Sequence, residues 1–363
     1  MRIVSLEEHI SLPEMIEQLP SELRPHASPA IQRLQPKLAD ITGERLRSMD
    51  ENGIAMQVLS VDGVGAQLLN PEAGPAFARR YNDLIAEKIA DYPNRFTAFA
   101  HLPITAPMAA ADELERAVHQ HHFRGAMIRG LSQDRFLDHP DFAPLLQMAE
   151  KLGVPVYIHP GMPPKAVADA YYSDLPHHPG LMESLACYGW GWHSETAIHV
   201  LRLLLAGVFD QYPGLRVIIG HMGEMLPMMM VRATRVFAPG NGGANQRTLI
   251  ETFRQQVFIT TSGIFTQPPL RIAIDTFGID NILFSVDYPF STNEMGLEFL
   301  RNIPLPASQI EQIATKGPGN GGASGRSLYL PVVSVRLRRY DGRFAGDQDG
   351  SATVVLCASR PGA

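Results

Sequence analysis

The sequence predicts an α/β protein built as a (β/α)8 barrel of the TIM type, slightly distorted and with inserted loops over the face where its strands end. Eight short apolar segments alternate with helical segments over residues 1–315, which is the repeat that builds such a barrel. Strand segments such as 154–158 and 215–219 are largely apolar, as expected for parallel strands covered on both faces. A doubly wound sheet is the alternative, and the first strand lacks the Gly-x-Gly-x-x-Gly turn that would favour it.

The expected elements follow one another in a regular order. The predicted strands span residues 2–6, 55–61, 96–102, 125–128, 154–158, 215–219, 256–261 and 281–286. The predicted helices span residues 43–52, 71–92, 108–118, 142–152, 195–209, 223–237, 268–277, 293–301 and 307–315. Two segments have no clear pattern, namely the proline-rich residues 10–42 and the aromatic-rich residues 160–193. We expect both to be irregular, and loops of that length often cover a site.

The pattern changes after residue 315. Residues 316–325 read Lys-Gly-Pro-Gly-Asn-Gly-Gly-Ala-Ser-Gly, which is typical of a linker or a disordered run. We therefore expect a barrel domain over residues 1–315, followed by a Gly-rich linker and an atypical tail over residues 316–363.

Composition limits the kind of partner and compartment. A net charge of -6 and a pI near 6.1 lack the basic surplus of a nucleic-acid-binding protein. The two cysteines, Cys187 and Cys357, form no disulfide framework and favour a reducing compartment. The chain begins directly in a strand and has no long apolar run, so we expect neither a signal peptide nor a membrane span, and a cytoplasmic location.

Polar residues suited to metal binding stand where the predicted strands end. They are Glu7 and His9 after the first strand, Arg129 after the fourth, His159 after the fifth, His221 after the sixth and Asp287 after the eighth. Barrel enzymes carry their catalytic groups at this end. Two histidines and two carboxylates there can bind Zn²⁺ or Mn²⁺ and leave a position open for a substrate. Each residue alone has an ordinary explanation as a turn or cap residue, but their joint occurrence favours a metal site.

Four motifs in order carry a resemblance to a known family. They are Leu-Glu-Glu-His, Ile-His-Pro-Gly, Ile-Ile-Gly-His-Met-Gly-Glu-Met-Leu-Pro and Phe-Ser-Val-Asp-Tyr-Pro-Phe. Over residues 1–315 the chain resembles the ACMSD-like branch of the amidohydrolase superfamily, the amidohydrolase 2 group, and within it the dihydroxybenzoate and γ-resorcylate decarboxylases. The resemblance implies one divalent ion, Zn²⁺ or Mn²⁺, held by Glu7, His9, His159 and Asp287.

The same resemblance assigns roles to further residues. His221 would lie beside the metal, oriented by Glu224, and Arg232 would hold the substrate carboxylate. Arg129 is a second candidate for that role, because it ends a barrel strand where the relatives carry Asn. The family's closing Asn-Ala-x-Arg-Leu helix is replaced here by the Gly-rich tail. We also expect a homo-oligomer, a dimer or a tetramer.

These features predict a metal-dependent, non-oxidative decarboxylase of a hydroxylated aromatic carboxylic acid. The metal would chelate the substrate, Asp287 would protonate the ring carbon, and no organic cofactor would be needed. The aromatic residues from Tyr171 to Trp192 either pack their loop onto the barrel or line a flat pocket. One alternative is a metal-dependent hydrolase of a lactone or related C–O bond, with Asp287 or His221 as base. A catalytically inactive scaffold is the other.

Overall fold

The computed structural model describes residues 1–24, 29–63, 65–174 and 180–315. The predicted tail of residues 316–363, including Cys357, lies outside these ranges, so the boundary at residue 315 stays a prediction. Among the described residues, no helix is both long and apolar enough to cross a membrane.

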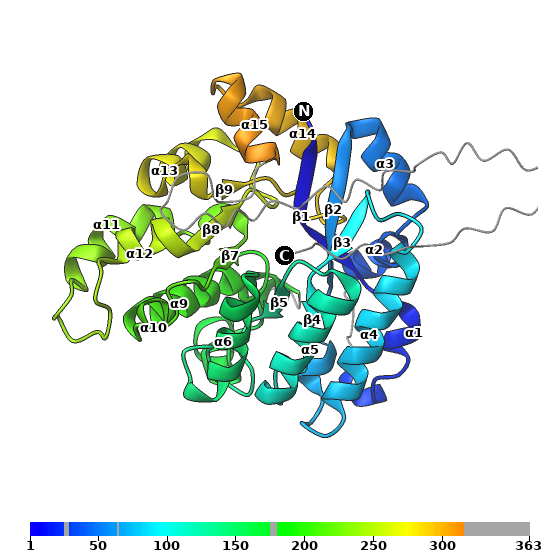
Figure 1. Cartoon of the computed structure of the whole chain (residues 1–363), viewed down its shortest axis with the longest axis horizontal. Helices are drawn as coiled ribbons and strands as arrows, with labels where there is room; N and C mark the ends of the chain where they lie inside the picture. The colour runs from blue at the N-terminus through cyan, green and yellow to red at the C-terminus, as the bar shows by residue number, and fades with distance from the viewer. Residues whose placement is uncertain (25–28, 64, 175–179, 316–363) are drawn as a thin grey trace, which may run out of the picture. The chain divides into compact units, whose positions relative to one another are not determined.

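The strands run parallel and follow chain order around a ring (Figure 1). They are β1 (Ile3–Ile10), β2 (Ile54–Val61), β3 (Phe96–Ala98), β4 (Ala100–His101), β5 (Ala126–Arg129), β6 (Val156–His159), β7 (Val217–Ile219), β8 (Val257–Thr260) and β9 (Ile282–Leu283).

One bent strand joins the two sheets of the ring. Only Phe99 separates β3 from β4, and its N–H donates to Leu59 O, whereas the next N–H, that of Ala100, donates to Gly125 O. The pair therefore acts as one strand that passes from β2 to β5. On the other side the ring is closed where Glu8 bridges Tyr288 in parallel register. Eight strands in consecutive order make the predicted barrel, and the doubly wound alternative is excluded.

Helices cover the outside of this ring (Figure 1). The α-helices are α1 (Pro13–Ile16), α2 (Pro29–Ala39), α3 (Glu44–Asn52), α4 (Gly74–Ile89), α5 (Pro107–His121), α6 (Ala143–Leu152), α7 (Lys165–Tyr171), α8 (Leu181–Ala186), α9 (Gly191–Leu205), α10 (Val208–Gln211), α11 (Leu226–Val236), α12 (Leu249–Gln256), α13 (Gln267–Phe277), α14 (Asn293–Asn302) and α15 (Ala307–Thr315). Short 3₁₀ turns are η1 (Ser21–Leu23), η2 (Gly65–Leu68), η3 (Pro140–Phe142), η4 (His221–Gly223) and η5 (Ile279–Asn281).

The expectation of irregular structure over residues 10–42 is wrong. Both α1 and α2 begin at a proline, which fits a first helical turn because its missing N–H needs no partner there. Leu12, Met15 and Leu38 of this segment are buried. Pro13 and Pro29 therefore mark helix starts, and Pro36 lies inside α2.

Other differences have equally local causes. Residues 160–193 contain α7 and α8, and the helix predicted over residues 195–209 is divided at Gly207, which has a φ of +70°. The unpredicted helix α12 begins with a capping box, in which the N–H of Glu251 donates to Thr248 Oγ1 and the Glu251 carboxylate accepts from Thr248. Such a box satisfies two N–H groups at the start of a helix.

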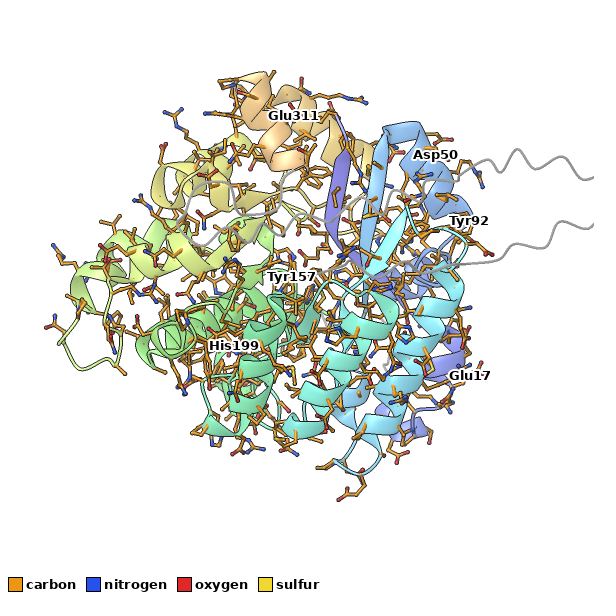
Figure 2. All side chains as sticks on the ribbon, viewed as in Figure 1. Glu17, Asp50, Tyr92, Tyr157, His199 and Glu311 are labelled. Atoms are coloured by element: carbon orange, nitrogen blue, oxygen red, sulfur yellow. The ribbon has the colours of Figure 1, made fainter. Side chains whose placement is uncertain are left out.

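A layer of side chains fills the barrel interior beneath the strand ends. It consists of Val58, Phe99, Met127, Tyr157, Ile218, Phe258 and Leu283. Figure 2 places Tyr157 near the middle of the ring of strands and Glu17, Asp50 and Glu311 toward the periphery. A larger apolar cluster fills the space between strands and helices. The interior layer matters for function because Tyr157 forms part of the floor of the site described next.

Candidate metal centre

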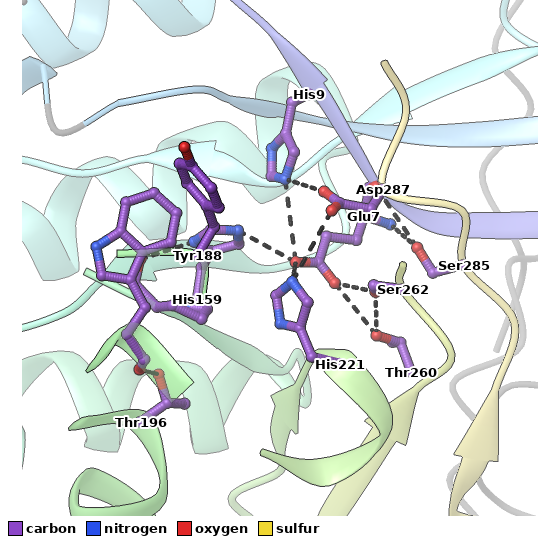
Figure 3. A network of polar contacts seen from close by, with 12 residues as sticks. Glu7, His9, His159, Tyr188, Thr196, His221, Thr260, Ser262, Ser285 and Asp287 are labelled. Atoms are coloured by element: carbon purple, nitrogen blue, oxygen red, sulfur yellow. Dashed lines mark hydrogen bonds and ion pairs between the residues drawn. The ribbon is translucent and has the colours of Figure 1, made fainter. Parts of the chain in front are cut away.

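Four side chains converge where β1, β6 and the segment after β9 end. Glu7, His9, His159 and Asp287 each offer a ligand atom, and these atoms all lie within 4.8 Å of one another. His159 Nε2 lies 3.2 Å from Glu7 Oε1, and His9 Nε2 lies 3.1 Å from Asp287 Oδ1. Figure 3 shows these groups pointing toward one another. The structure thus brings together all four residues that the resemblance implied as ligands.

The two oxygens of Glu7 have different surroundings. Oε2 accepts hydrogen bonds from the hydroxyls of Thr260 and Ser262 (Figure 3). It also accepts one from the hydroxyl of Tyr157. Oε1 is buried and has no hydrogen-bond partner among the described residues, and the same holds for His9 Nε2. Such buried, unsatisfied polar atoms are costly. Two of them directed at one point fit a divalent cation.

Protonation states fit the same conclusion. Burial, together with the charge of Arg129, lowers the pKa of His9 well below its ordinary value and also lowers the pKa of His159. Both rings are therefore neutral, which is the form that ligates metals. Burial tends to raise the pKa of Glu7, but the nearby His221 and His159 outweigh it and hold that pKa well below its ordinary value.

Asp287 has the opposite tendency. Burial, and next the negative charge of Glu7, raise the pKa of Asp287 well above its ordinary value. Two carboxylates this close together cannot both be ionised easily, and one of them keeps a proton. The backbone of Asp287 has a φ of +71°, an uncommon conformation for a residue other than Gly. A raised pKa and a strained backbone are both typical of catalytic positions.

A histidine–carboxylate–histidine triad stands beside the cluster. Glu224 is buried, and its two oxygens lie 2.7 Å from His221 Nδ1 and 2.6 Å from His193 Nδ1. His221 Nε2 is 3.9 Å from both Glu7 Oε1 and Asp287 Oδ2. Burial alone would lower the pKa of His221, but the carboxylates of Glu224 and Glu7 raise it to about 10. His221 therefore lies next to the cluster as a cation.

His193 was not among the predicted site residues. It lies near the start of α9, directly after Trp192, and its sequence context gives no sign of a contact with Glu224. A residue 31 positions from its partner is found only once the fold is known.

The two predicted anchors for a substrate carboxylate lie in different places. Arg129 is buried, and its Nη2 lies 3.0 Å from Asp62 Oδ1 and 3.2 Å from His9 Nδ1. Arg232 is exposed on α11 and forms no ion pair among the described residues. The structure brings Arg129 to the cluster and leaves Arg232 on the surface, and both roles stay predictions.

Aromatic rings surround the cluster. Trp192 meets His159 edge-on with ring centres 6.3 Å apart, and Phe290 meets His9 at 5.7 Å. Tyr172 is buried, whereas Tyr188 and Trp190 are more than half exposed. Trp192 thus fits the pocket interpretation, Tyr172 fits packing, and Phe290 is a neighbour of the site that the sequence pattern did not indicate.

Comparison with known proteins gives a consistent result. A family model described as Amidohydrolase matches residues 24–316. The γ-resorcylate decarboxylase of Rhizobium sp. (strain MTP-10005) is 38% identical over 303 residues, which cover 79% of this chain and 88% of that protein.

Two solved structures have the same fold. The 2,6-dihydroxybenzoate decarboxylase from Rhizobium matches with a TM-score of 0.77 and 34% identity, covering 86% of this chain and 96% of that one. The dihydroxybenzoic acid decarboxylase from Polaromonas sp. JS666 matches with a TM-score of 0.77 and 33% identity, covering 86% and 94%. That structure contains bound manganese and the inhibitor 2-nitroresorcinol.

Proposed function

This chain belongs to the amidohydrolase family, and from that premise we propose that it is a metal-dependent, non-oxidative decarboxylase of a hydroxylated aromatic acid of the dihydroxybenzoate type. The observation that carries the proposal is a four-residue metal-ligand cluster that includes a carboxyl group with a strongly raised pKa, that of Asp287. A carboxylic acid whose pKa is raised can hold a proton and deliver it to carbon.

Glu7, His9, His159 and Asp287 would hold one Mn²⁺ or Zn²⁺ ion, and manganese is the ion in the Polaromonas neighbour. When bound, the ion supplies Lewis-acid polarisation and a template for the carboxylate and phenolic oxygens of the substrate. Arg129 or Arg232 would pair with the substrate carboxylate, because a guanidinium grips a carboxylate through two parallel hydrogen bonds.

Asp287 would carry out the proton transfer. Its O–H bond breaks as a new C–H bond forms at the ring carbon that bears the carboxylate. The bond between that carbon and the carboxylate then breaks, its electron pair restores the aromatic ring, and CO₂ leaves. Asp287 is left as a carboxylate, stabilised by the cationic His221, and it regains a proton from solvent. Glu224 keeps His221 in place through its hydrogen bond to Nδ1.

The test is a screen of ortho-hydroxybenzoates for CO₂ release in D₂O. We expect deuterium at the ring carbon that lost CO₂, and no turnover by Asp287→Asn although the protein stays folded. Arg232→Lys and Arg129→Lys, assayed in parallel, would identify the anchor through a raised KM. If the protein opened a lactone and released no CO₂ from any hydroxybenzoate, the hydrolase alternative would replace this proposal.

The proposal includes an oligomer and a compartment. We propose a homo-oligomer, a dimer or a tetramer, supported by the exposed apolar side chains of Met228, Met229 and Val231 on α11. Light scattering of the purified protein would test it, and a monomeric mass would contradict it.

We also propose a cytoplasmic location, supported by the free, buried thiol of Cys187. Cell fractionation would test the location.

A further inference from the structure

We propose that Glu8, which does not belong to the metal-ligand cluster, is the positioning residue that fixes the direction of Asp287. The inference rests on the proposed function, in which Asp287 binds the ion and protonates the substrate. It arises from the way Glu8 holds the chain on both sides of Asp287.

The Glu8 carboxylate binds the two peptide N–H groups that flank Asp287. Its Oε1 accepts from Val286 N at 3.1 Å, and its Oε2 accepts from Tyr288 N at 3.1 Å. The N–H of Asp287 itself donates to Glu7 O, also at 3.1 Å. Three successive N–H groups are thus held by two successive residues of β1.

This arrangement fixes a backbone that would otherwise relax. Asp287 has a left-handed φ of +71°, which a residue with a side chain keeps only when its surroundings impose it. The conformation directs the carboxyl group to His9 Nε2, 3.1 Å away. If either flanking hydrogen bond were lost, rotation about this residue would move the carboxyl group out of the cluster.

Hydrogen-bond donors occupy both oxygens of the Glu8 carboxylate. It is fully buried, and it accepts further hydrogen bonds from Ser5, from Ser285 at 3.2 Å and from Gln57 at 3.4 Å. All five partners are donors, which favours the ionised form, whereas burial raises the pKa of Glu8 to about 7. Both oxygens are occupied, so neither is available to an ion or a substrate.

A buried carboxylate elsewhere in the barrel supplies a matched control. Glu113 on α5 is 6% exposed and accepts hydrogen bonds from Asn82 and Arg116. None of its hydrogen-bond partners belongs to the cluster or to residues 286–288. Glu113→Gln therefore makes the same chemical change as Glu8→Gln, in both cases without altering a proposed ligand.

The test is a double-mutant cycle on Mn²⁺ affinity, measured by titration of metal-free protein. In Glu8→Gln the new amide NH₂ group faces peptide donors, so one flanking hydrogen bond is lost. We expect this variant to bind Mn²⁺ at least about tenfold more weakly than wild type. Removing a residue that hydrogen-bonds to a metal ligand commonly weakens metal affinity by that amount. In an Asp287→Asn background the same change should have no further effect, within twofold, because Glu8 acts through Asp287. Glu113→Gln should match wild type.

Turnover supplies a second readout. At saturating Mn²⁺, Glu8→Gln should lower kcat for the hydroxybenzoate at least about tenfold, by loss of the Asp287 proton transfer, and leave KM within about threefold. Glu8→Asp keeps the charge, but its side chain is too short to reach both N–H groups, so it should show the same losses of Mn²⁺ affinity and kcat. This variant provides the test if Glu8→Gln fails to fold.

Two results would overturn the inference. One is an equal loss of Mn²⁺ affinity from the Glu8 substitution in both backgrounds, which would indicate a general structural role. The other is unchanged affinity and kcat in the Glu8 variants. If wild-type protein released no CO₂ from any hydroxybenzoate, the proposed function would fail, but the Mn²⁺ cycle would still decide whether Glu8 positions Asp287.

Discussion

In this site, side chains of the same type have different proposed roles, because some would bind the metal and others would transfer or stabilise a proton. The pKa of Glu7 is lowered and that of Asp287 is raised, because each carboxyl group responds to different neighbours. His159 and His221 differ in the same way, since one is neutral and the other is a cation with a pKa near 10. Similar residue types therefore take different roles within one cluster.

This division predicts that substitutions of the two histidines have different effects. His159→Ala removes a neutral ring 3.2 Å from Glu7 Oε1, so we expect it to lose both metal and activity. His221→Asn leaves the ligands in place, so turnover should fall far more than metal content. Metal analysis alongside assays of both variants tests this. An equal loss of metal in His221→Asn would make His221 a direct ligand.

A glycine beside the cluster gives a second prediction. A Cβ atom at Gly220 would lie 2.8 Å from Glu7 Oε2 and 3.2 Å from the Tyr157 hydroxyl. Gly220→Ala should therefore displace Glu7 and weaken metal affinity about tenfold or more, a size typical of changes around metal ligands. Gly74→Ala is the control, because its nearest contact would be an ordinary 3.4 Å. Equal affinities in the two variants would refute the prediction.

At the scale of whole elements, helix α9 provides a test of pH dependence. His199 on this helix is buried, and its Nε2 accepts from Leu137 N at 2.9 Å. Burial lowers its pKa to about 3. Because this pKa lies below that of the unfolded chain, near 6.5, the neutral ring contributes full stability above pH 6.5. The contribution is lost as the pH falls toward 3.

We therefore expect the free energy of unfolding to depend less on pH in His199→Gln than in wild type. Between pH 6.5 and 5, the wild-type value should fall by about 1 kcal/mol more per pH unit, the amount that one displaced proton contributes. Urea unfolding of both proteins at several pH values measures this difference. Parallel slopes would show that His199 titrates normally.

The elements also show how far sequence reasoning reaches. The ends of β5, β6 and β7 lie within one residue of their predicted positions, because apolar runs stop at polar residues. The first strand was predicted too short, since β1 continues through Glu7 and His9 to Ile10. The contacts that complete the site could not be predicted from the sequence. Ser262 and Glu7, for example, are 255 residues apart, and no local pattern relates them. The helices α1 and α12 were missed for a different reason, because proline starts and short capped segments carry little periodicity.

At the scale of the whole molecule, the resemblance inferred from four motifs is confirmed by the family model and by relatives that are decarboxylases. The barrel and the carboxy-lyase class follow from the same relatives. The tail has no such support, because the match to the family model ends at residue 316.

The tail gives the last prediction. Every proposed ligand lies before residue 316, and the Gly-rich sequence that follows predicts a linker. A chain ending at Thr315 should therefore keep wild-type metal content, and limited proteolysis of the full chain should cut between residues 317 and 325. Loss of metal binding on truncation would show that the tail supports the barrel.

The contact that closes the barrel, between β1 and the segment after β9, has a consequence for how newly synthesised chains reach the folded state. Glu8 meets Tyr288 N across 280 positions, so a growing chain has no complete metal site until its last barrel strand has left the ribosome. The ion can then bind tightly only to finished barrels, and it raises their stability in proportion to the logarithm of its concentration. Metal supply would thus influence how many newly made chains escape degradation.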